Sequence, residues 1–286
     1  MGTLGIDPDW VKTTFNQLSG VQHRDQGGFK EVYSATHPIH GLVALKIITP
    51  NQPIEVTERE IRAAKTVGSS RVPTILEVGL TDVPHIGQCV YLMESWISGT
   101  TIRKILEGGP LPFDSVLQLG KDVLEALASA EAARIVHRDV KPENIRCDES
   151  ARYWLLDFGI ARHLTLSSLT GSGPGLGKGT LGYASPEQMS NSKSEIDSRA
   201  DLFAVGITLH ECTTGLHPFA NGAKSDIDVI QRVQRMRIPD LPNAATEPEF
   251  TQFILAMTQK QPHHRPSTVA EAQKWLEDLC ASRRQR

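Results

Sequence analysis

The sequence predicts an α+β protein in which a small strand-rich lobe precedes a larger helical lobe. Phe29–Ala35 and Leu42–Ile48 are rich in β-branched and aromatic residues, and the turn-like HPIHG separates them. The larger lobe is indicated by an amphipathic pattern that follows Asp114 and by an apolar stretch that begins at Asp201. Hydrophobic residues make up 39% of the 286 positions, which is ordinary for a soluble globular chain.

In the first lobe, Pro53 begins a charged, alanine-containing segment of helical character, EVTEREIRAAKTV, and Val90–Met93 is a further short strand. In the second lobe, Asp114 can cap a helix whose apolar residues have the spacing of a half-buried stripe: Val116, Leu119, Val123, Leu124 and Leu127. Tyr153–Leu156 reads as a strand. The stretch DLFAVGITLHEC is apolar on nearly every side, so we expect a helix buried in the middle of its lobe.

Composition excludes several function classes. The net charge is −3, so no basic field favours a nucleic-acid partner. Four scattered cysteines without a C-x-x-C pair fit reduced thiols in a cytoplasmic setting better than a disulfide frame or a zinc site. No apolar run approaches the roughly 18 residues that a transmembrane helix needs, so we expect no membrane segment in this chain.

The glycine-rich stretch GSGPGLGKGT resembles a phosphate-binding loop but fails the pattern. A Walker-type loop requires Ser or Thr directly after Gly-Lys, whereas Lys178 is followed by Gly179. The following TLGYASPEQ contains Pro186 and no apolar helical period, so no helix N-terminus faces a phosphate here. We interpret the stretch as a loop that is costly to order.

The segment HRDVKPEN, His137 to Asn144, is the most informative in the chain, and DFG begins thirteen residues after Asn144. Phosphoryl transfer needs a carboxylate that receives the hydroxyl proton, a cation for the migrating phosphoryl group and hard oxygen ligands for Mg²⁺. Asp139, Lys141, Asn144 and Asp157 supply these groups in that order.

With these residues in place, the chain resembles the eukaryotic-like Ser/Thr protein kinases from about Val21 to Leu279. The four motifs that carry the resemblance are Val43-Ala44-Leu45-Lys46, His137-Arg138-Asp139, Asp157-Phe158-Gly159 and Ser185-Pro186-Glu187. The segment GTLGYASPEQ is more similar to the bacterial branch. The resemblance implies a bilobal fold: an N-terminal extension over residues 1–20, a small lobe of antiparallel sheet and one regulatory helix over 21–94, and a mainly helical lobe over 95–286.

The resemblance also implies a role for each matching residue. Asp139 and Lys141 would be catalytic, and Asn144 and Asp157 would hold Mg²⁺ or Mn²⁺. Lys46 would bind the ATP phosphates and pair with a helix glutamate. We choose Glu60, since Glu58 lies with Arg62 and Lys65 on the side expected to face water. The rest of the nucleotide site would comprise Gly27, Gly28, Ala44, Met93 at the back of the adenine pocket, and the backbone of Glu94 and Trp96.

The glycine-rich stretch then belongs to the activation segment between DFG and SPE. Thr170 and Ser172 are candidate phosphorylation sites, and Arg138 could pair with a phosphate added there. Thr180 and Lys141 are typical of Ser/Thr rather than Tyr specificity. Three residues would be architectural: Glu187 and Arg265 as a buried ion pair, and Asp201 as a brace for the catalytic loop.

The sequence departs from the family pattern in the phosphate-covering loop, where Asp25 and Lys30 stand at the positions of the first and third glycines. This departure motivates the alternative of a pseudokinase that acts as a binding or regulatory module. A third hypothesis is a small-molecule kinase similar to aminoglycoside phosphotransferases. The long activation segment, with 29 residues between Asp157 and Glu187, argues against it.

The favoured hypothesis is an ATP- and Mg²⁺-dependent Ser/Thr protein kinase. Its partners would be proteins with accessible Ser or Thr hydroxyls, and a homodimer could form for autophosphorylation in trans. The retention of Lys46, Asp139, Asn144 and Asp157 favours an active enzyme over a scaffold, because a scaffold has no need for both metal ligands and the base.

Overall fold

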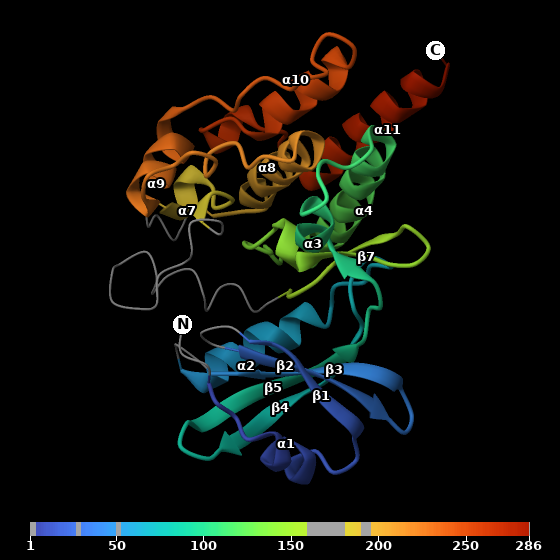
Figure 1. Cartoon of the computed structure of the whole chain (residues 1–286), viewed down its shortest axis with the longest axis vertical. Helices are drawn as coiled ribbons and strands as arrows, with labels where there is room; N and C mark the ends of the chain where they lie inside the picture. The colour runs from blue at the N-terminus through green and yellow to red at the C-terminus, as the bar shows by residue number, and fades with distance from the viewer. Residues whose placement is uncertain (1–3, 27–29, 50–52, 159–180, 190–195, 286) are drawn as a thin grey trace. The chain divides into compact units, whose positions relative to one another are not determined.

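The computed structural model describes residues 4–26, 30–49, 53–158, 181–189 and 196–285. Within them the chain forms two compact units (Figure 1). Of the described residues, the first unit contains those within 4–67 and 73–97 together with Phe158, and the second contains those within 68–72, 98–157 and 181–285. Residues 68–72, which link the two main parts of the first unit, therefore belong to the second unit. Neither unit is a single continuous stretch of the chain.

The first unit is built on a five-stranded antiparallel sheet of order β1-β2-β3-β5-β4. Its strands are β1 (Ser19–Gln26), β2 (Lys30–His37), β3 (Gly41–Ile48), β4 (Ile75–Val83) and β5 (Gly87–Ser95). The strands predicted over 29–35, 42–48 and 90–93 fall within β2, β3 and β5 for their described residues. Strand β1 escaped prediction because nearly all of its residues are exposed, so it lacks an apolar alternation.

Two helices cover opposite faces of this sheet (Figure 1). Helix α1 (Pro8–Thr14) begins at Asp7, whose side chain accepts a hydrogen bond from the Asp9 amide. Val11 and Phe15 join the apolar cluster on one face of the sheet. Helix α2 (Ile54–Ala64) follows Pro53, as predicted, and buries three residues toward the other face: Thr57, Ile61 and Ala64.

The second unit is mainly helical. Helix α4 packs against α8, α11 and strand β8, and α8 packs against α10 (Figure 1). The helices are α3 (Ile102–Leu106), α4 (Phe113–Ala132), α7 (Pro186–Met189), α8 (Arg199–Thr214), α9 (Asp226–Arg235), α10 (Pro248–Met257) and α11 (Val269–Gln285), with 3₁₀ turns η1 (Pro142–Asn144) and η2 (Pro262–His264). Every residue from Ala200 to Cys212 is buried, which confirms the predicted central helix.

The predicted cap of α4 is wrong. The helix begins two residues earlier than the proposed cap implies, with Pro112 at the N-cap, so Asp114 lies inside the first turn. The Asp114 carboxylate instead forms an ion pair with Arg283 of α11. An acidic residue in the first turn still favours the helix, because it faces the positive end of the helix dipole.

A short three-stranded sheet frames the loop that contains Asp139. It has the order β6-β7-β8, from β6 (Thr100–Thr101), β7 (Ile145–Cys147) and β8 (Tyr153–Leu155). Strand β7 begins directly after η1, and β8 ends two residues before Asp157. The predicted strand at Tyr153–Leu156 is thereby confirmed to within one residue, and the two ends of this hairpin carry Asn144 and Asp157.

Candidate active site

The side chains of Asp139, Lys141 and Asn144 form one hydrogen-bonded cluster in the second unit. The Lys141 ammonium lies 2.8 Å from each carboxylate oxygen of Asp139. The Asn144 Nδ2 donates to the Asp139 carboxylate and to its backbone carbonyl, both at 2.8 Å. These bonds fix the rotamer of Asp139 and place a carboxylate and a cation side by side, the two kinds of group that phosphoryl transfer to a hydroxyl needs.

Asp201 holds the backbone of this loop from helix α8. Its two carboxylate oxygens accept hydrogen bonds from the amides of His137 and Arg138, at 2.8 and 2.7 Å. Arg138 has a φ of 68°, an unusual conformation for a residue with a side chain, and these bonds offset its cost. Burial raises the pKa of Asp201, and the hydrogen bonds from the two amides act in the opposite direction. The bracing position predicted for Asp201 is confirmed.

His137 connects the loop to the end of strand β8. Its Nε2 donates to the Leu156 carbonyl at 2.8 Å, while its Nδ1 accepts from the Asp139 amide at 3.3 Å. Together the two bonds require the neutral tautomer with the proton on Nε2. The ring is buried, so it serves as a link between backbone segments.

Asn144 and Asp157 come close through the backbone. The Leu156 amide donates to the Asn144 carbonyl at 2.8 Å, and Asp157 is the next residue. Asp157 has a φ of 68°, which turns the chain sharply at this point. The Asn144 amide nitrogen is committed to Asp139, so its amide oxygen, with the Asp157 carboxylate, is of the hard oxygen type that could hold a divalent metal ion.

Arg103 of helix α3 forms a second charged cluster next to the catalytic loop. Its Nε donates to Glu143 at 2.8 Å and its Nη1 to Glu211 of α8 at 2.8 Å. Its Nη2 donates to the Tyr183 hydroxyl at 2.7 Å, and that hydroxyl in turn donates to Glu211. Burial and the Glu211 charge raise the pKa of Tyr183 well above its usual value, so it stays a donor. The cluster ties Glu143, between Lys141 and Asn144, to two helices.

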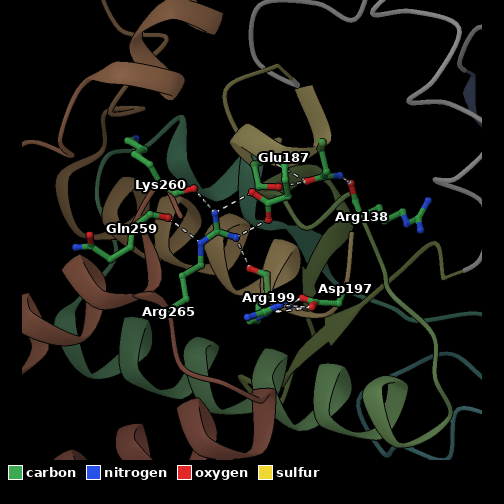
Figure 2. Close-up of polar contacts among 9 residues, drawn as sticks. Arg138, Glu187, Asp197, Arg199, Gln259, Lys260 and Arg265 are labelled. Atoms are coloured by element: carbon green, nitrogen blue, oxygen red, sulfur yellow. Dashed lines mark hydrogen bonds and ion pairs between the residues drawn. The ribbon is translucent and has the colours of Figure 1, made fainter. Parts of the chain in front are cut away.

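The predicted ion pair between Glu187 and Arg265 is confirmed (Figure 2). It is bidentate, with Nη1–Oε1 at 2.6 Å and Nη2–Oε2 at 2.9 Å, and its side chains are 0% and 7% exposed for Arg265 and Glu187. The remaining guanidinium hydrogens go to three backbone carbonyls: Arg199 at 2.8 Å, Gln259 at 2.8 Å and Lys260 at 3.2 Å. All donors of a buried charge are thereby used.

The helix that starts after Ser185 also contacts the catalytic loop. Gln188 donates from Nε2 to the Arg138 carbonyl at 3.0 Å, and its Oε1 accepts from the Ser185 amide at 2.9 Å. The SPE motif and the HRD motif are therefore joined by one side chain that the sequence analysis did not single out. A polar residue directly after SPE was the only available signal.

In the first unit, the Lys46 ammonium lies 2.5 Å from Glu94 Oε1, and the two side chains are 5% and 8% exposed. Glu94 comes from β5 and Lys46 from β3. Glu60, the partner expected for Lys46, lies half-buried on α2, and its pairing with Lys46 stays a prediction. Glu58 forms the surface pair with Arg62 that the sequence indicated, at 2.6 Å.

Strand register places Met93 on the face of the sheet away from Lys46, so its predicted place at the back of the adenine pocket is wrong. In the β3–β5 ladder, Leu45 pairs with Met93 while Ala44 pairs with Glu94. Met93 joins Leu45 in the cluster that α1 covers. Side chains alternate along a strand, so Glu94 shares a face with Ala44 and Lys46.

The proposed use of the Trp96 amide for the base is also corrected. That amide donates to the Leu42 carbonyl at 3.1 Å and so belongs to the sheet. The error has the same origin as that for Met93, since both positions came from one assumed register of YLMESW.

Several predicted residues cannot be placed. Gly27, Gly28, Thr170, Ser172 and Thr180 lie outside the described residues. Over the part of the chain that the structure describes, no helix combines the length and apolarity needed to cross a membrane. Within the same ranges, no three His, Cys, Asp or Glu side chains gather as a metal-binding group, and the four cysteines are free.

A five-stranded antiparallel unit with a buried lysine, and a helical unit whose loop presents Asp139, Lys141 and Asn144, together define a phosphotransferase of the protein kinase type. Comparison with known proteins agrees: the family model "Protein kinase domain" matches residues 23–277. The chain belongs to the protein kinase family.

The relatives identify the branch. A probable serine/threonine-protein kinase of Clostridium perfringens is 29% identical over 269 residues, which cover 90% of this chain and 37% of that protein. Serine/threonine-protein kinase PknL of Mycobacterium tuberculosis is 34% identical over 66% of this chain and 46% of its own length. PknD of the same species is 36% identical over 73% of this chain and 31% of its own. The chain groups with bacterial Ser/Thr kinases and spans less than half of each of these three.

Proposed function

We propose that the chain transfers the γ-phosphoryl group of ATP to Ser or Thr hydroxyls of proteins, with Mg²⁺ or Mn²⁺ as cofactor. The observation that carries this proposal is the arrangement of Asp139 with Lys141 and Asn144 at 2.8 Å. Asp139 would accept the proton of the attacking hydroxyl, and Lys141 would offset the charge of the migrating group. A bound metal ion would neutralise phosphate charge, held by Asn144 and Asp157.

On the small unit, Lys46 would contact the ATP phosphates. Because Trp96 donates to Leu42, the backbone group that reads the base is expected one position later, at Ile97. Thr180 would favour Ser and Thr substrates, and autophosphorylation at Thr170 or Ser172, in a homodimer, would create an anion that Arg138 could bind. We expect the domain to act in the cytoplasm and not to bind nucleic acid.

The test is mass spectrometry of the purified chain after incubation with Mg·ATP. We expect phosphate on Ser or Thr in the wild type. Asp139→Asn should slow its incorporation by about 10²–10⁴-fold, because an amide cannot accept the proton. Lys46→Ala should lower it as well. The matched control is Asp240→Asn, an equal change at an exposed carboxylate, which should incorporate phosphate at the wild-type rate. Equal rates for Asp139→Asn and wild type would refute the assigned role.

A pseudokinase remains a second candidate, because the Lys46 ammonium is engaged by Glu94 and because Asp25, an exposed residue of β1, replaces a glycine of the phosphate-covering loop. This reading predicts that Mg·ATP neither raises the melting temperature of the wild type nor labels it. Either effect would favour the enzyme.

A further inference from the structure

The contact between Lys46 and Glu94 is a feature of this chain's own strand register. Lys46 pairs with Leu92 and Ala44 with Glu94, so the ammonium reaches diagonally across the ladder to the carboxylate. Both side chains are more than nine-tenths buried, and the nitrogen and oxygen lie 2.5 Å apart. A close pair in a poorly solvated place attracts strongly, because little water screens the two charges.

Glu94 and Glu60 differ in how they are held. Glu94 lies in the interior strand β5, between β3 and β4, and its position is fixed by strand pairing on both sides. Glu60 lies half-buried on α2, next to the inward residue Ile61. Lysine carries a point charge on a flexible stem, so it can exchange one carboxylate for another without a change in the backbone.

We propose that Glu94 is a positioning residue that holds Lys46 across the β3–β5 ladder, so that the ATP phosphates must compete with its carboxylate for the ammonium. The inference rests on the proposed function, in which Lys46 binds ATP. A lysine held by a buried carboxylate is only partly available to an anion. The apparent dissociation constant for ATP is then raised by the reciprocal of the available fraction.

This competition gives Glu94 and Glu60 opposite effects on nucleotide binding. Glu94→Gln keeps the size of the side chain and removes its charge, so this carboxylate no longer competes with phosphate for the ammonium. We expect Mg·ATP to bind about tenfold more tightly, the change that a rise in the available fraction from one-tenth to nearly one would give. Glu60→Gln removes the carboxylate that the family resemblance assigns to Lys46 in the productive state, and we expect weaker binding and a lower kcat.

The experiment measures the dissociation constant of Mg·ATP by calorimetry for four forms of the chain: wild type, Glu94→Gln, Glu60→Gln and Glu58→Gln. Glu58 lies on the same helix as Glu60 but pairs with Arg62 at the surface, so its variant should bind like the wild type. The kcat for phosphate incorporation is measured on the same samples, which separates nucleotide binding from chemistry.

The melting temperature without nucleotide supplies a readout that does not depend on activity. Glu94→Gln and Lys46→Met should each lower it, since each leaves one buried charge without this partner, and the double variant should recover part of the loss. A variant that misfolds is recognised here before its binding is interpreted.

Weaker Mg·ATP binding by Glu94→Gln, with Glu60→Gln unchanged, would overturn the inference and make Glu94 the productive partner. Unchanged binding by Glu94→Gln would also overturn it, while leaving the proposed function intact. A folded wild type that does not bind Mg·ATP at all would overturn the proposed function, and the inference with it.

Discussion

Two buried ion pairs, one in each unit, have the same formal charges but different surroundings. Arg265 and Glu187 meet through two parallel bonds, and three backbone carbonyls accept the remaining guanidinium hydrogens. The Lys46 ammonium lies 2.5 Å from Oε1 of Glu94. The first pair joins an SPE motif to a loop after α10, whereas the second joins two adjacent strands.

The difference separates architecture from chemistry. A planar guanidinium with every donor used cannot change partner without breaking several bonds, so Arg265 fixes the large unit. A lysine ammonium can rotate from one acceptor to another, so the Lys46 pair can open when an anion arrives. We therefore expect the two pairs to differ in their response to mutation and to nucleotide.

The largest expected effect is the loss of Arg265. Arg265→Met leaves the Glu187 carboxylate buried without its bidentate partner, and three backbone carbonyls lose their hydrogen-bond donor. The free energy of unfolding should therefore fall by about 3–5 kcal/mol. The urea midpoint of unfolding measures it. Lys274→Met provides the control, because Lys274 pairs with Asp278 on the exposed side of α11 and its loss should leave the midpoint unchanged. A midpoint for Arg265→Met equal to that of the control would show that the pair is not architectural.

A buried histidine in the same unit should make stability depend on pH. His217 accepts hydrogen bonds at Nδ1 from the amides of Phe219 and Ala220, and its ring packs edge-on against Tyr183 with the ring centroids 4.7 Å apart. Burial, with a smaller contribution from the Arg103 charge, lowers the pKa of His217 from 6.5 to about 4. Its neutral form is therefore the folded form.

A folded pKa below the unfolded one gives stability that is fully present above pH 6.5 and is lost as the pH falls toward 4. From this residue alone, the free energy of unfolding should fall by about 2 kcal/mol between pH 7.5 and 5. His217→Gln, which keeps an acceptor for the two amides, should remove that part of the decline. Parallel pH profiles for wild type and variant in urea unfolding would contradict the assignment.

A smaller effect is expected at Arg103, whose side chain is 34% exposed. Arg103→Met removes the hydrogen bonds to Glu143, Glu211 and Tyr183 and keeps only the bond between the Tyr183 hydroxyl and Glu211. The loop between Lys141 and Asn144 should therefore lose order. We expect kcat for phosphate incorporation to fall about tenfold, equivalent to about 1.4 kcal/mol, with little change in the KM for ATP. Arg103→Lys should restore part of kcat. A change confined to KM would place Arg103 in nucleotide binding instead.

The catalytic cluster could be predicted from the sequence because its members are close together in the chain. Asp139, Lys141 and Asn144 lie within six consecutive residues, so local bonds alone bring them together. The pair of Glu187 and Arg265 was predictable only through the family resemblance, since 78 positions separate its members.

Strand register could not be predicted. Leu92 and Met93 are both apolar, so the pattern of YLMESW does not show which of them faces Lys46, and a one-residue shift exchanges the two faces. This is why Glu94 was expected to act through its backbone and not through its carboxylate. For the Arg103 cluster a signal did exist: Glu211 is a charged residue inside the buried helix α8, and a buried carboxylate needs a partner.

The contrast between the two ion pairs is tested most directly by double-mutant cycles run with and without saturating Mg·ATP. The variants are Arg265→Met with Glu187→Gln, and Lys46→Met with Glu94→Gln, and the coupling energies come from unfolding in urea. We predict that nucleotide leaves the Arg265–Glu187 coupling unchanged and reduces the Lys46–Glu94 coupling. A Lys46–Glu94 coupling that is unchanged or larger with Mg·ATP would contradict the exchange of Lys46 between Glu94 and the nucleotide.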